Sequence, residues 1–580
     1  MSTDSNTNTG QNNTNTTNSG NTQQTGTIDT ISGIIKQATK TVLDNIESNG
    51  KPYPEPEEIG SMILAQTNSL RRANNIFVEK GEKIRVQYNL IPNTIADILI
   101  RFHHAVYIVE NINDPKYGSV AIYAEDGPNK GIYVTNEAII AQVIMEYRYN
   151  ISAKEIAEVL KLLAVRAPAV ARTKGRHLIA VNNGIFDYDK KVLMPFDSKY
   201  IFTSKSHVDF NLNATNVVIH NPNDGTDWDI ESWMNEIASN DPEMVELFWQ
   251  ICGAVIRPNV SWNRAVIFYS ERGNNGKGTL CQLLRNIVGE DSCASLSLTD
   301  MGKDFMLEPL THASAIINDE NDVGIYIDKA ANFKALVTAD TISINRKHQM
   351  PISYKWHGVV LECLNEMPRV KDKSDSFMRR QLFVPFKKCF TGAERKYIKN
   401  DYLKRKDVLE YVLKKVLVDT DYYEFTTPEV CKEALETYKE YVDPVRQFAN
   451  DIFPNASWDL LPFEFLYDMY KAWYNRTNPT GSMQSRPSFV KDIKALVRSG
   501  DISGWTLVGD GNGKIRPGTK MSKPEPLIAE YDLKDWMNPN YKNADKANTA
   551  IKCTPTIYQI RDNYRGVLRD TVSDTVTIDD

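Results

Sequence analysis

Residues 269–280, YSERGNNGKGTL, carry the pattern on which the fold assignment rests. They approach the phosphate-binding loop pattern G-x-x-x-x-G-K-[ST], but Glu271 occupies the first glycine position and Gly278 stands where a hydroxyl residue belongs. The flanking sequence supports such a loop, because an apolar, β-rich run (264–270) precedes it and apolar residues at helical spacing (278–289) follow it. Strand, glycine-rich loop and helix together predict a nucleotide site rather than an isolated turn.

This loop is expected to bind the phosphates of ATP. Backbone amides at a helix N-terminus attract phosphate oxygens, and Lys277 is placed to reach the outer phosphates. Glu271 is compatible with this role if Gly273 carries the tight turn. Thr279 is the nearest hydroxyl that can replace the one missing at Gly278 as a ligand of Mg²⁺. The predicted cofactor-binding residues are Gly273, Asn274, Asn275, Gly276, Lys277, Gly278 and Thr279.

An acidic pair follows some forty residues after the loop. In HASAIINDEND, residues 312–322, a short apolar strand runs into Asp319 and Glu320. An ATPase places its Mg²⁺-organising Asp and its water-activating Glu at the end of such a strand. We therefore predict Asp319 as a metal ligand and Glu320 as the catalytic base, rather than two solvated turn residues.

Two further segments complete the predicted catalytic set. HGVVLECLNEMPRV, residues 357–370, is an apolar strand ending at Asn365, an amide that can orient the attacking water or the γ-phosphate. DKSDSFMRRQLFVPF, residues 372–386, places Arg379 and Arg380 just before another strand. One of these arginines is expected to reach into a neighbouring subunit's site as an arginine finger, and the sequence leaves open which one.

Between the acidic strand and the Asn365 strand lies TISINRKHQMPISY, residues 341–354. Apolar and polar residues alternate on both sides of a cationic tip, which predicts a β-hairpin. The tip residues are Arg346, Lys347 and His348. Taken alone they are typical of a solvated turn, and the family resemblance given below implies that they contact DNA, whose phosphate backbone a cationic tip can follow without reading the sequence.

The composition sets broad limits on the 580-residue chain. It carries a net charge of −6, and no uninterrupted apolar run is long enough to cross a membrane. The seven cysteines (252, 281, 293, 363, 389, 431 and 553) include no C-x-x-C pair, which argues against a disulfide framework or a zinc site. No signal peptide is visible, so we expect a cytoplasmic protein, in a bacterial host, without a membrane partner.

The chain is expected to be α/β, with a P-loop ATPase core between two other domains. The predicted segments are a disordered polar tail (1–27), a mixed α+β domain (28–225), an ATPase domain opening on a helical collar (226–400), a helical connector (401–445) and a winged-helix domain (446–580). In the last segment, GDGNGKI also contains Gly, Asn and Lys, but it is predicted to be a hairpin turn between two strands.

The N-terminal domain leaves two questions open. Asp187 and Asp189 can be viewed as a metal pair of a polymerase or primase, but turn carboxylates in a hairpin are the favoured interpretation because no matching His or third carboxylate accompanies them. A basic run (Arg166, Arg172, Lys174 and Arg176) is either a nucleic-acid contact or a solvated face.

Four of these pieces, GNNGKGT, IINDEND, residues 333–370 and SDSFMRRQLFVPF, resemble the superfamily 3 helicases, in particular the phage, plasmid and poxvirus primase-helicase group. The resemblance covers roughly residues 150–400. It implies an AAA+-like motor that forms hexameric rings and translocates on single-stranded DNA, with Lys347 and His348 matching the family's hairpin tip.

The leading hypothesis is therefore an ATP- and Mg²⁺-dependent replicative helicase of a phage or mobile element, a homo-hexamer acting on single-stranded and forked duplex DNA. One alternative adds primase activity. Another is a replication initiator that binds origin DNA through its C-terminal domain and uses ATP mainly for assembly. A metabolic P-loop kinase is disfavoured because it has no use for the hairpin and the arginine pair.

Overall fold

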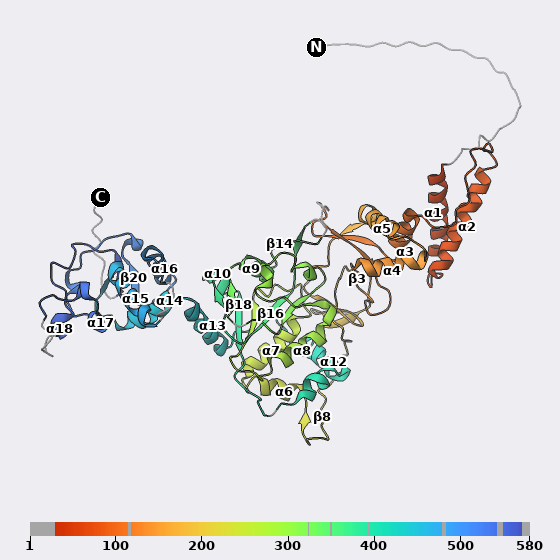
Figure 1. Cartoon of the computed structure of the whole chain (residues 1–580). Coiled ribbons are helices and arrows are strands. Elements are labelled where there is room, and N and C mark those ends of the chain that lie inside the picture. The colour runs from red at the N-terminus through yellow and green to blue at the C-terminus, as the bar shows by residue number, and fades with distance from the viewer. Residues whose placement is uncertain are drawn as a thin grey trace, which may run out of the picture. The chain divides into compact units, whose positions relative to one another are not determined.

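The computed structural model describes residues 30–113, 118–322, 324–347, 351–392, 394–477, 483–541 and 549–570. The predicted polar tail at 1–27 and the hairpin-tip residue His348 lie outside these ranges. The chain divides into two compact units, residues 1–171 and 172–580 (Figure 1). This division falls earlier than the predicted boundary at 225/226.

The first unit is a mixed α+β domain. Its sheet has the order β3-β2-β1-β4, and its helices bury apolar faces in a core that includes Ile95, Leu99, Ile140 and Leu163. Helix α5 begins with the predicted capping box of Ser152 and Glu155. The elements are α1 (Ile31–Asn49), α2 (Pro56–Asn74), α3 (Pro92–Phe102), β1 (Val106–Val109), β2 (Gly118–Tyr123), β3 (Tyr133–Val134), α4 (Glu137–Tyr147), α5 (Ala153–Arg166) and β4 (Ala169–Val170).

The second unit opens with antiparallel strands that belong to its own core. Val181 and Phe186 share a hydrophobic cluster with the helices and the parallel sheet that follow them, which explains why the division precedes them. These elements are β5 (Leu178–Val181), β6 (Gly184–Asp187), β7 (Val192–Met194), β8 (Ile219–His220), β9 (Asp227–Trp228), α6 (Ile230–Ile237) and α7 (Pro242–Ala254). Helices α6 and α7 lie where the helical collar was predicted.

A five-stranded parallel sheet in the order β11-β12-β16-β10-β18 forms the centre of this unit. Its strands are almost entirely buried, as expected for a parallel sheet covered on both faces. The fold class is therefore α/β with a parallel sheet. Because β16 lies between β10 and β12, residues that follow these three strands meet at one edge. The strands are β10 (Ala265–Tyr269), β11 (Cys293–Ala294), β12 (Ala315–Asn318), β16 (Val359–Leu364) and β18 (Gln381–Pro385).

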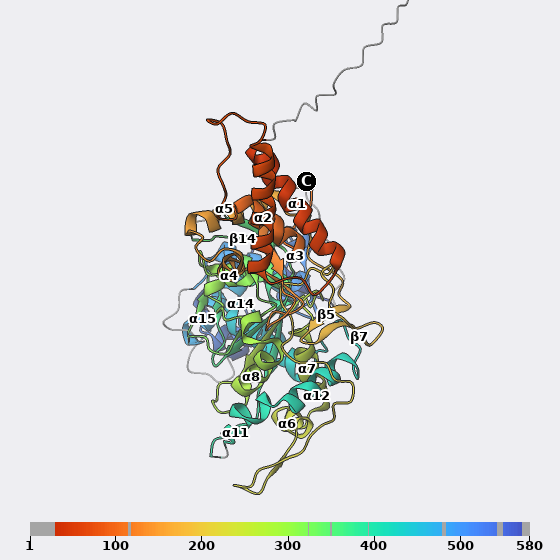
Figure 2. The same ribbon diagram turned by 90° about the vertical axis from the view of Figure 1, so that its right-hand side faces the viewer.

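The helices between residues 396 and 442, where a helical connector (401–445) was predicted, pack on this core. Helix α12 lies against α7 and α8 (Figure 2). The Tyr438 ring of α13 packs 4.7 Å from the ring of Phe383 in β18. The remaining elements of the segment are α8 (Lys277–Val288), β13 (Tyr326–Ile327), α9 (Ala331–Val337), β14 (Thr341–Ile344), β15 (Ile352–Lys355), β17 (Arg369–Val370), α10 (Asp375–Met378), α11 (Lys396–Asn400), α12 (Lys406–Leu417) and α13 (Glu429–Val442).

The C-terminal segment has its own hydrophobic core and a three-stranded sheet in the order β19-β21-β20. The hairpin predicted at GDGNGKI is wrong, because β20 pairs with β21 more than fifty residues later and Ile515 bridges Tyr564. Short helices fill the interval. The elements are α14 (Pro444–Ile452), β19 (Leu460–Pro462), α15 (Phe463–Thr477), α16 (Arg486–Arg498), β20 (Trp505–Leu507), α17 (Pro526–Glu530), α18 (Thr549–Lys552) and β21 (Gly566–Arg569).

Candidate nucleotide-binding site

The glycine-rich loop joins β10 to the N-terminus of α8, as the sequence predicted. Its left-handed residues are Asn274 (φ 54°) and Gly276 (φ 92°), whereas Gly273, which was expected to carry the turn, has no positive φ. A β-carbon at Gly276 would also lie 3.2 Å from Ile237. The buried Asn275 fixes the loop, because its Oδ1 accepts a hydrogen bond from the Lys277 amide at 3.2 Å and its Nδ2 donates to the Arg272 carbonyl.

Lys277 begins α8 with its side chain turned back under the loop. Its Nζ donates to Asn365 Oδ1 at 2.9 Å and to the Ser270 carbonyl at 3.2 Å. Burial lowers the pKa of the Lys277 ammonium. The structure thus brings together the loop lysine and the amide predicted at the end of β16, because β10 and β16 are neighbours in the sheet.

The acidic pair follows β12, one strand further along the same edge. The Asp319 carboxylate accepts two hydrogen bonds from the Arg285 guanidinium, at 2.9 and 3.2 Å, and these bonds hold the pKa of Asp319 below its usual value. Arg285, on α8, was not identified from the sequence, where it is one of several charged residues on a helix. Glu320 is exposed, and among the described residues its carboxylate has no hydrogen-bond or ion-pair partner.

A buried carboxyl group lies beneath the acidic pair and was also missed. Glu362, in the middle of β16, is 0% exposed and accepts hydrogen bonds from the amides of Asn318 (3.0 Å) and Asn321 (2.8 Å). Burial raises its pKa to about 8, so this side chain is protonated at neutral pH. Asn318 Nδ2 also lies 3.0 Å from the Glu320 carbonyl, which links the network to the chain that carries the acidic pair.

The two arginines before β18 differ in how firmly they are held. Arg380 donates to the carbonyl and hydroxyl of Ser376 and so caps the end of α10. The Arg379 side chain is 65% exposed, and its ion pair with Asp375 spans 3.8 Å. Arg379 is therefore the arginine of the pair that is available to a partner molecule.

The predicted hairpin is present as the antiparallel pair β14–β15, in the register Thr341↔Lys355 to Ile344↔Ile352. Its apolar face is buried, and Arg172 packs over the Tyr354 ring at 4.8 Å, so this member of the basic run has a structural partner. At the tip, Arg346 is half-buried and Lys347 is exposed.

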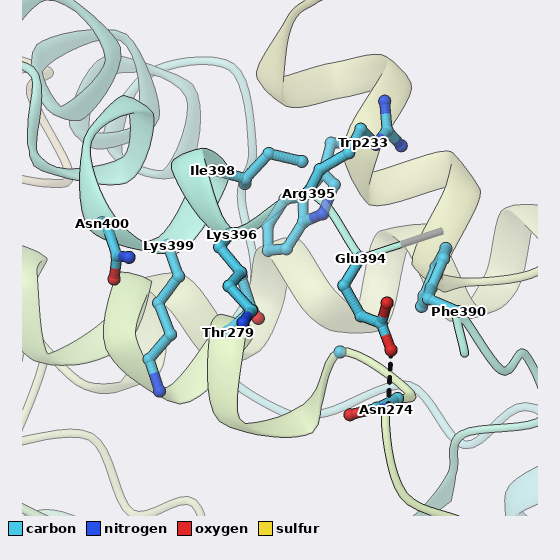
Figure 3. Close-up of a pocket in the computed structure, with 11 residues that line it drawn as sticks. Trp233, Asn274, Thr279, Phe390, Glu394, Arg395, Lys396, Ile398, Lys399 and Asn400 are labelled. Carbon is cyan, nitrogen blue, oxygen red and sulfur yellow. Dashed lines mark hydrogen bonds between the residues drawn. The ribbon is translucent and has the colours of Figure 1, made fainter. Parts of the chain in front are cut away.

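A pocket of about 360 Å³ adjoins the glycine-rich loop (Figure 3). Thr279, predicted as a metal ligand, lines this pocket together with Trp233 of α6. The outer wall is attached to the loop tip, because the Phe390 amide donates to the Asn274 carbonyl at 2.7 Å and Asn274 Nδ2 donates to Glu394 at 3.0 Å. The lining residues are Trp233, Asn274, Gly276, Thr279, Phe390, Glu394, Arg395, Lys396, Ile398, Lys399 and Asn400.

The carboxylates suspected of primase chemistry have structural partners. Asp187 is buried, accepts the Lys190 amide at 3.1 Å and pairs with its ammonium at 3.0 Å, whereas Asp189 accepts the Tyr423 hydroxyl at 2.7 Å. Within the described ranges, no three His, Cys, Asp or Glu side chains cluster closely enough to hold a metal ion. Nor does any described helix combine the length and apolarity that a membrane crossing requires.

Three family models match separate parts of the chain. Residues 97–239 match "D5 N terminal like", residues 268–380 match a family of unknown function (DUF5906), and residues 440–538 match "Poxvirus D5 protein-like". The two D5 matches lie on either side of the glycine-rich loop in the sequence and indicate a primase-helicase-like replication protein of viral or phage type. They agree with the resemblance to the group that includes poxvirus primase-helicases.

No curated protein matches the chain. Among solved structures, an apo form of the NrS-1 C-terminal region is similar at 14% identity with a TM-score of 0.41, covering 82% of this chain and 100% of that one. A second apo structure, of NrS-1 residues 305–718, has a TM-score of 0.40 at 14% identity and covers 83% of this chain and 100% of that one. Likeness at this level assigns neither a fold nor an activity.

Proposed function

We propose that this protein is a superfamily 3-type, AAA+-like DNA helicase that hydrolyses ATP as a homo-hexameric ring and serves the replication of a phage or mobile element. The observation that carries the proposal is the contact between Lys277 and Asn365 at the ends of adjacent parallel strands, with Asp319 and Glu320 one strand away. A phosphate-binding lysine, a polar amide and an acidic pair at one sheet edge are the groups that phosphoryl transfer to water requires.

Each group has a distinct role in this proposal. The amides of residues 273–277 and the N-terminus of α8 bind phosphate oxygens, and Lys277 exchanges its bond to Asn365 for one to phosphate. Asp319, which Arg285 keeps ionised, is the residue that would hold Mg²⁺, and the ion would neutralise charge on the phosphates. Glu320 accepts the proton of the attacking water, and Arg379 acts in the site of the adjoining subunit.

The hairpin β14–β15 is the proposed DNA contact. Its buried face fixes it to the domain, and its exposed Lys347 is free to follow the backbone of a strand threaded through the ring. The decisive test is ATP-dependent strand displacement on forked DNA, with native mass measured in parallel. Wild type should form hexamers and unwind, and Lys277→Ala should lose ATP hydrolysis. A monomer with ATP and DNA present, or undiminished turnover by Lys277→Ala, would refute the proposal.

A second candidate function, duplex binding by an initiator, is favoured by a basic groove of about 420 Å³ in the C-terminal segment. Glu464 is the one acidic residue in its lining, and it lies 3.1 Å from Arg561. Clustered cations on one face are the electrostatic footprint of a nucleic-acid backbone. The cations are Arg486, Lys494, Lys514, Arg561 and Arg565.

The salt dependence of duplex binding tests this candidate. Replacing Arg561 and Arg565 by Gln should weaken binding and reduce the slope of log K against log salt by about two, because two phosphate contacts are lost. An unchanged slope would exclude the groove as the duplex contact. Primase activity has less support, since Asp187 and Asp189 are both occupied by structural partners.

A further inference from the structure

A lysine of the outer pocket wall reaches the first turn of α8. Lys399, on the short helix α11, extends toward α8 (Figure 3). A β-carbon placed on Gly278 would lie 3.8 Å from the Lys399 Nζ. The ammonium therefore lies near the start of α8.

The fold does not use this cation. Of the other cations that line the pocket, Arg395 pairs with Glu236, and Lys396 is exposed to solvent, whereas Lys399 is not. Lys399 is half-buried, and within the described part of the chain no hydrogen bond or ion pair satisfies its ammonium. A partly desolvated, unpaired charge is unfavourable by itself, which points to an anion that is absent from the chain.

Lys399 lies opposite Gly278, the residue at which the loop departs from the usual pattern. The residue after the loop lysine ordinarily supplies a hydroxyl for the ion that neutralises the phosphates, and Gly278 has none. Neither backbone nor packing requires glycine here, because Gly278 has no positive φ and a β-carbon would approach only Lys399. The missing side chain leaves open the space that faces the ammonium.

We infer that Lys399 is a second phosphate-binding lysine, which contacts the nucleotide bound by its own subunit, and that the adjoining 360 Å³ pocket receives the nucleoside. The pocket suits a nucleoside because it combines apolar surfaces, from Trp233, Phe390 and Ile398, with polar groups. The inference rests on the proposed function for the existence of the nucleotide site. It adds a phosphate contact that the loop motif does not contain.

Binding measurements on the full chain test this inference. Affinities for ATP and adenosine are compared for wild type, Lys399→Gln, Lys399→Arg, Lys277→Ala and Lys404→Gln. Lys404 is a matched control, because it is an exposed lysine of the next helical turn and lies outside the pocket. Lys399→Gln should weaken ATP binding roughly 10- to 100-fold, the loss expected for one charged hydrogen bond, and leave adenosine binding unchanged. Lys399→Arg and Lys404→Gln should stay close to wild type.

The possible failures are distinguishable. Wild-type protein that binds no nucleotide would overturn the proposed function and this inference together. If Lys277→Ala loses ATP affinity but Lys399→Gln does not, only the inference fails. It fails equally if Lys399→Gln weakens adenosine and ATP by the same factor, since the residue then shapes the pocket rather than binding phosphate. Unchanged adenosine binding also shows that the variant is folded.

Discussion

Replacing the buried Glu362 by glutamine should make the protein more stable at neutral pH. Glu362 is 0% exposed, and burial raises its pKa from the usual 4.5 to about 8. The folded protein therefore binds a proton that the unfolded chain has released, throughout the interval between these two values. Within that interval the free energy of unfolding falls as the pH rises, because the folded state holds more protons than the unfolded state.

The size of the effect follows from the two pKa values. Each pH unit above 4.5 lowers the free energy of unfolding by about 1.4 kcal/mol, until the pH reaches the pKa of Glu362 in the folded protein. The cost is about 1.4 kcal/mol at pH ~5.5 and about 4 kcal/mol at pH ~7.5. Glutamine at residue 362 imitates the protonated acid, because its amide oxygen accepts from Asn318 and Asn321 and it never ionises. The stabilisation by Glu362→Gln should therefore grow by about 3 kcal/mol across this range.

Thermal melting of the full chain at several pH values measures this change. The difference in Tm between Glu362→Gln and wild type should widen by roughly 5 °C from pH ~5.5 to ~7.5, at roughly 2 °C per kcal/mol for a large domain. Glu366→Gln, an exposed glutamate just beyond the same strand, is the control and should shift nothing. A difference in Tm between wild type and Glu362→Gln that stays constant from pH ~5.5 to ~7.5 would refute the raised pKa of Glu362.

Three further predictions concern the proposed motor. Arg379→Ala should retain ATP binding but lose hydrolysis. Arg380→Ala should mainly lower the Tm, because it removes the cap at the end of α10. Equal loss of hydrolysis in both variants would contradict these separate roles. Glu320→Gln should bind ATP and hydrolyse it at least a hundredfold more slowly, and an unchanged kcat would assign the base elsewhere. Lys347→Ala should keep basal ATPase activity and lose unwinding of forked DNA. Lys355→Ala, at the exposed base of the hairpin, should unwind normally, and equal unwinding by both variants would show that the tip does not contact the DNA.

The sequence predicted the elements that depend on neighbouring residues. Alternation over residues 341–354 is a local pattern, and the antiparallel pair β14–β15 was found in that position. The strand, loop and helix around Lys277 were likewise identified from adjoining apolar runs. The meeting of Lys277 and Asn365 was implied once both were placed after parallel strands, because such strands end at the same sheet edge.

Features that depend on distant pairing were not predicted. The strand predicted after Gly513 to complete a hairpin proved to be an isolated bridge at Ile515, and β20 instead found its partner at Gly566–Arg569. No local pattern marks a partner so far along the chain. The boundary at 171/172 was not predicted for a related reason. In the sequence, β5 to β7 look like a continuation of the preceding domain, and only the structure shows that their side chains belong to the core of the next one.

The charges around the loop show why a departure from the usual pattern need not remove the site. A polyphosphate is bound mainly by fixed cations and amides, so the sum of nearby positive charge matters more than any single hydroxyl. Arg285 is committed to Asp319 by two hydrogen bonds, whereas Lys277 and Lys399 are the two cations that we propose contact the nucleotide. One comes from the loop and one from α11, over a hundred residues later. A motif search finds the first, and only the folded chain reveals the second.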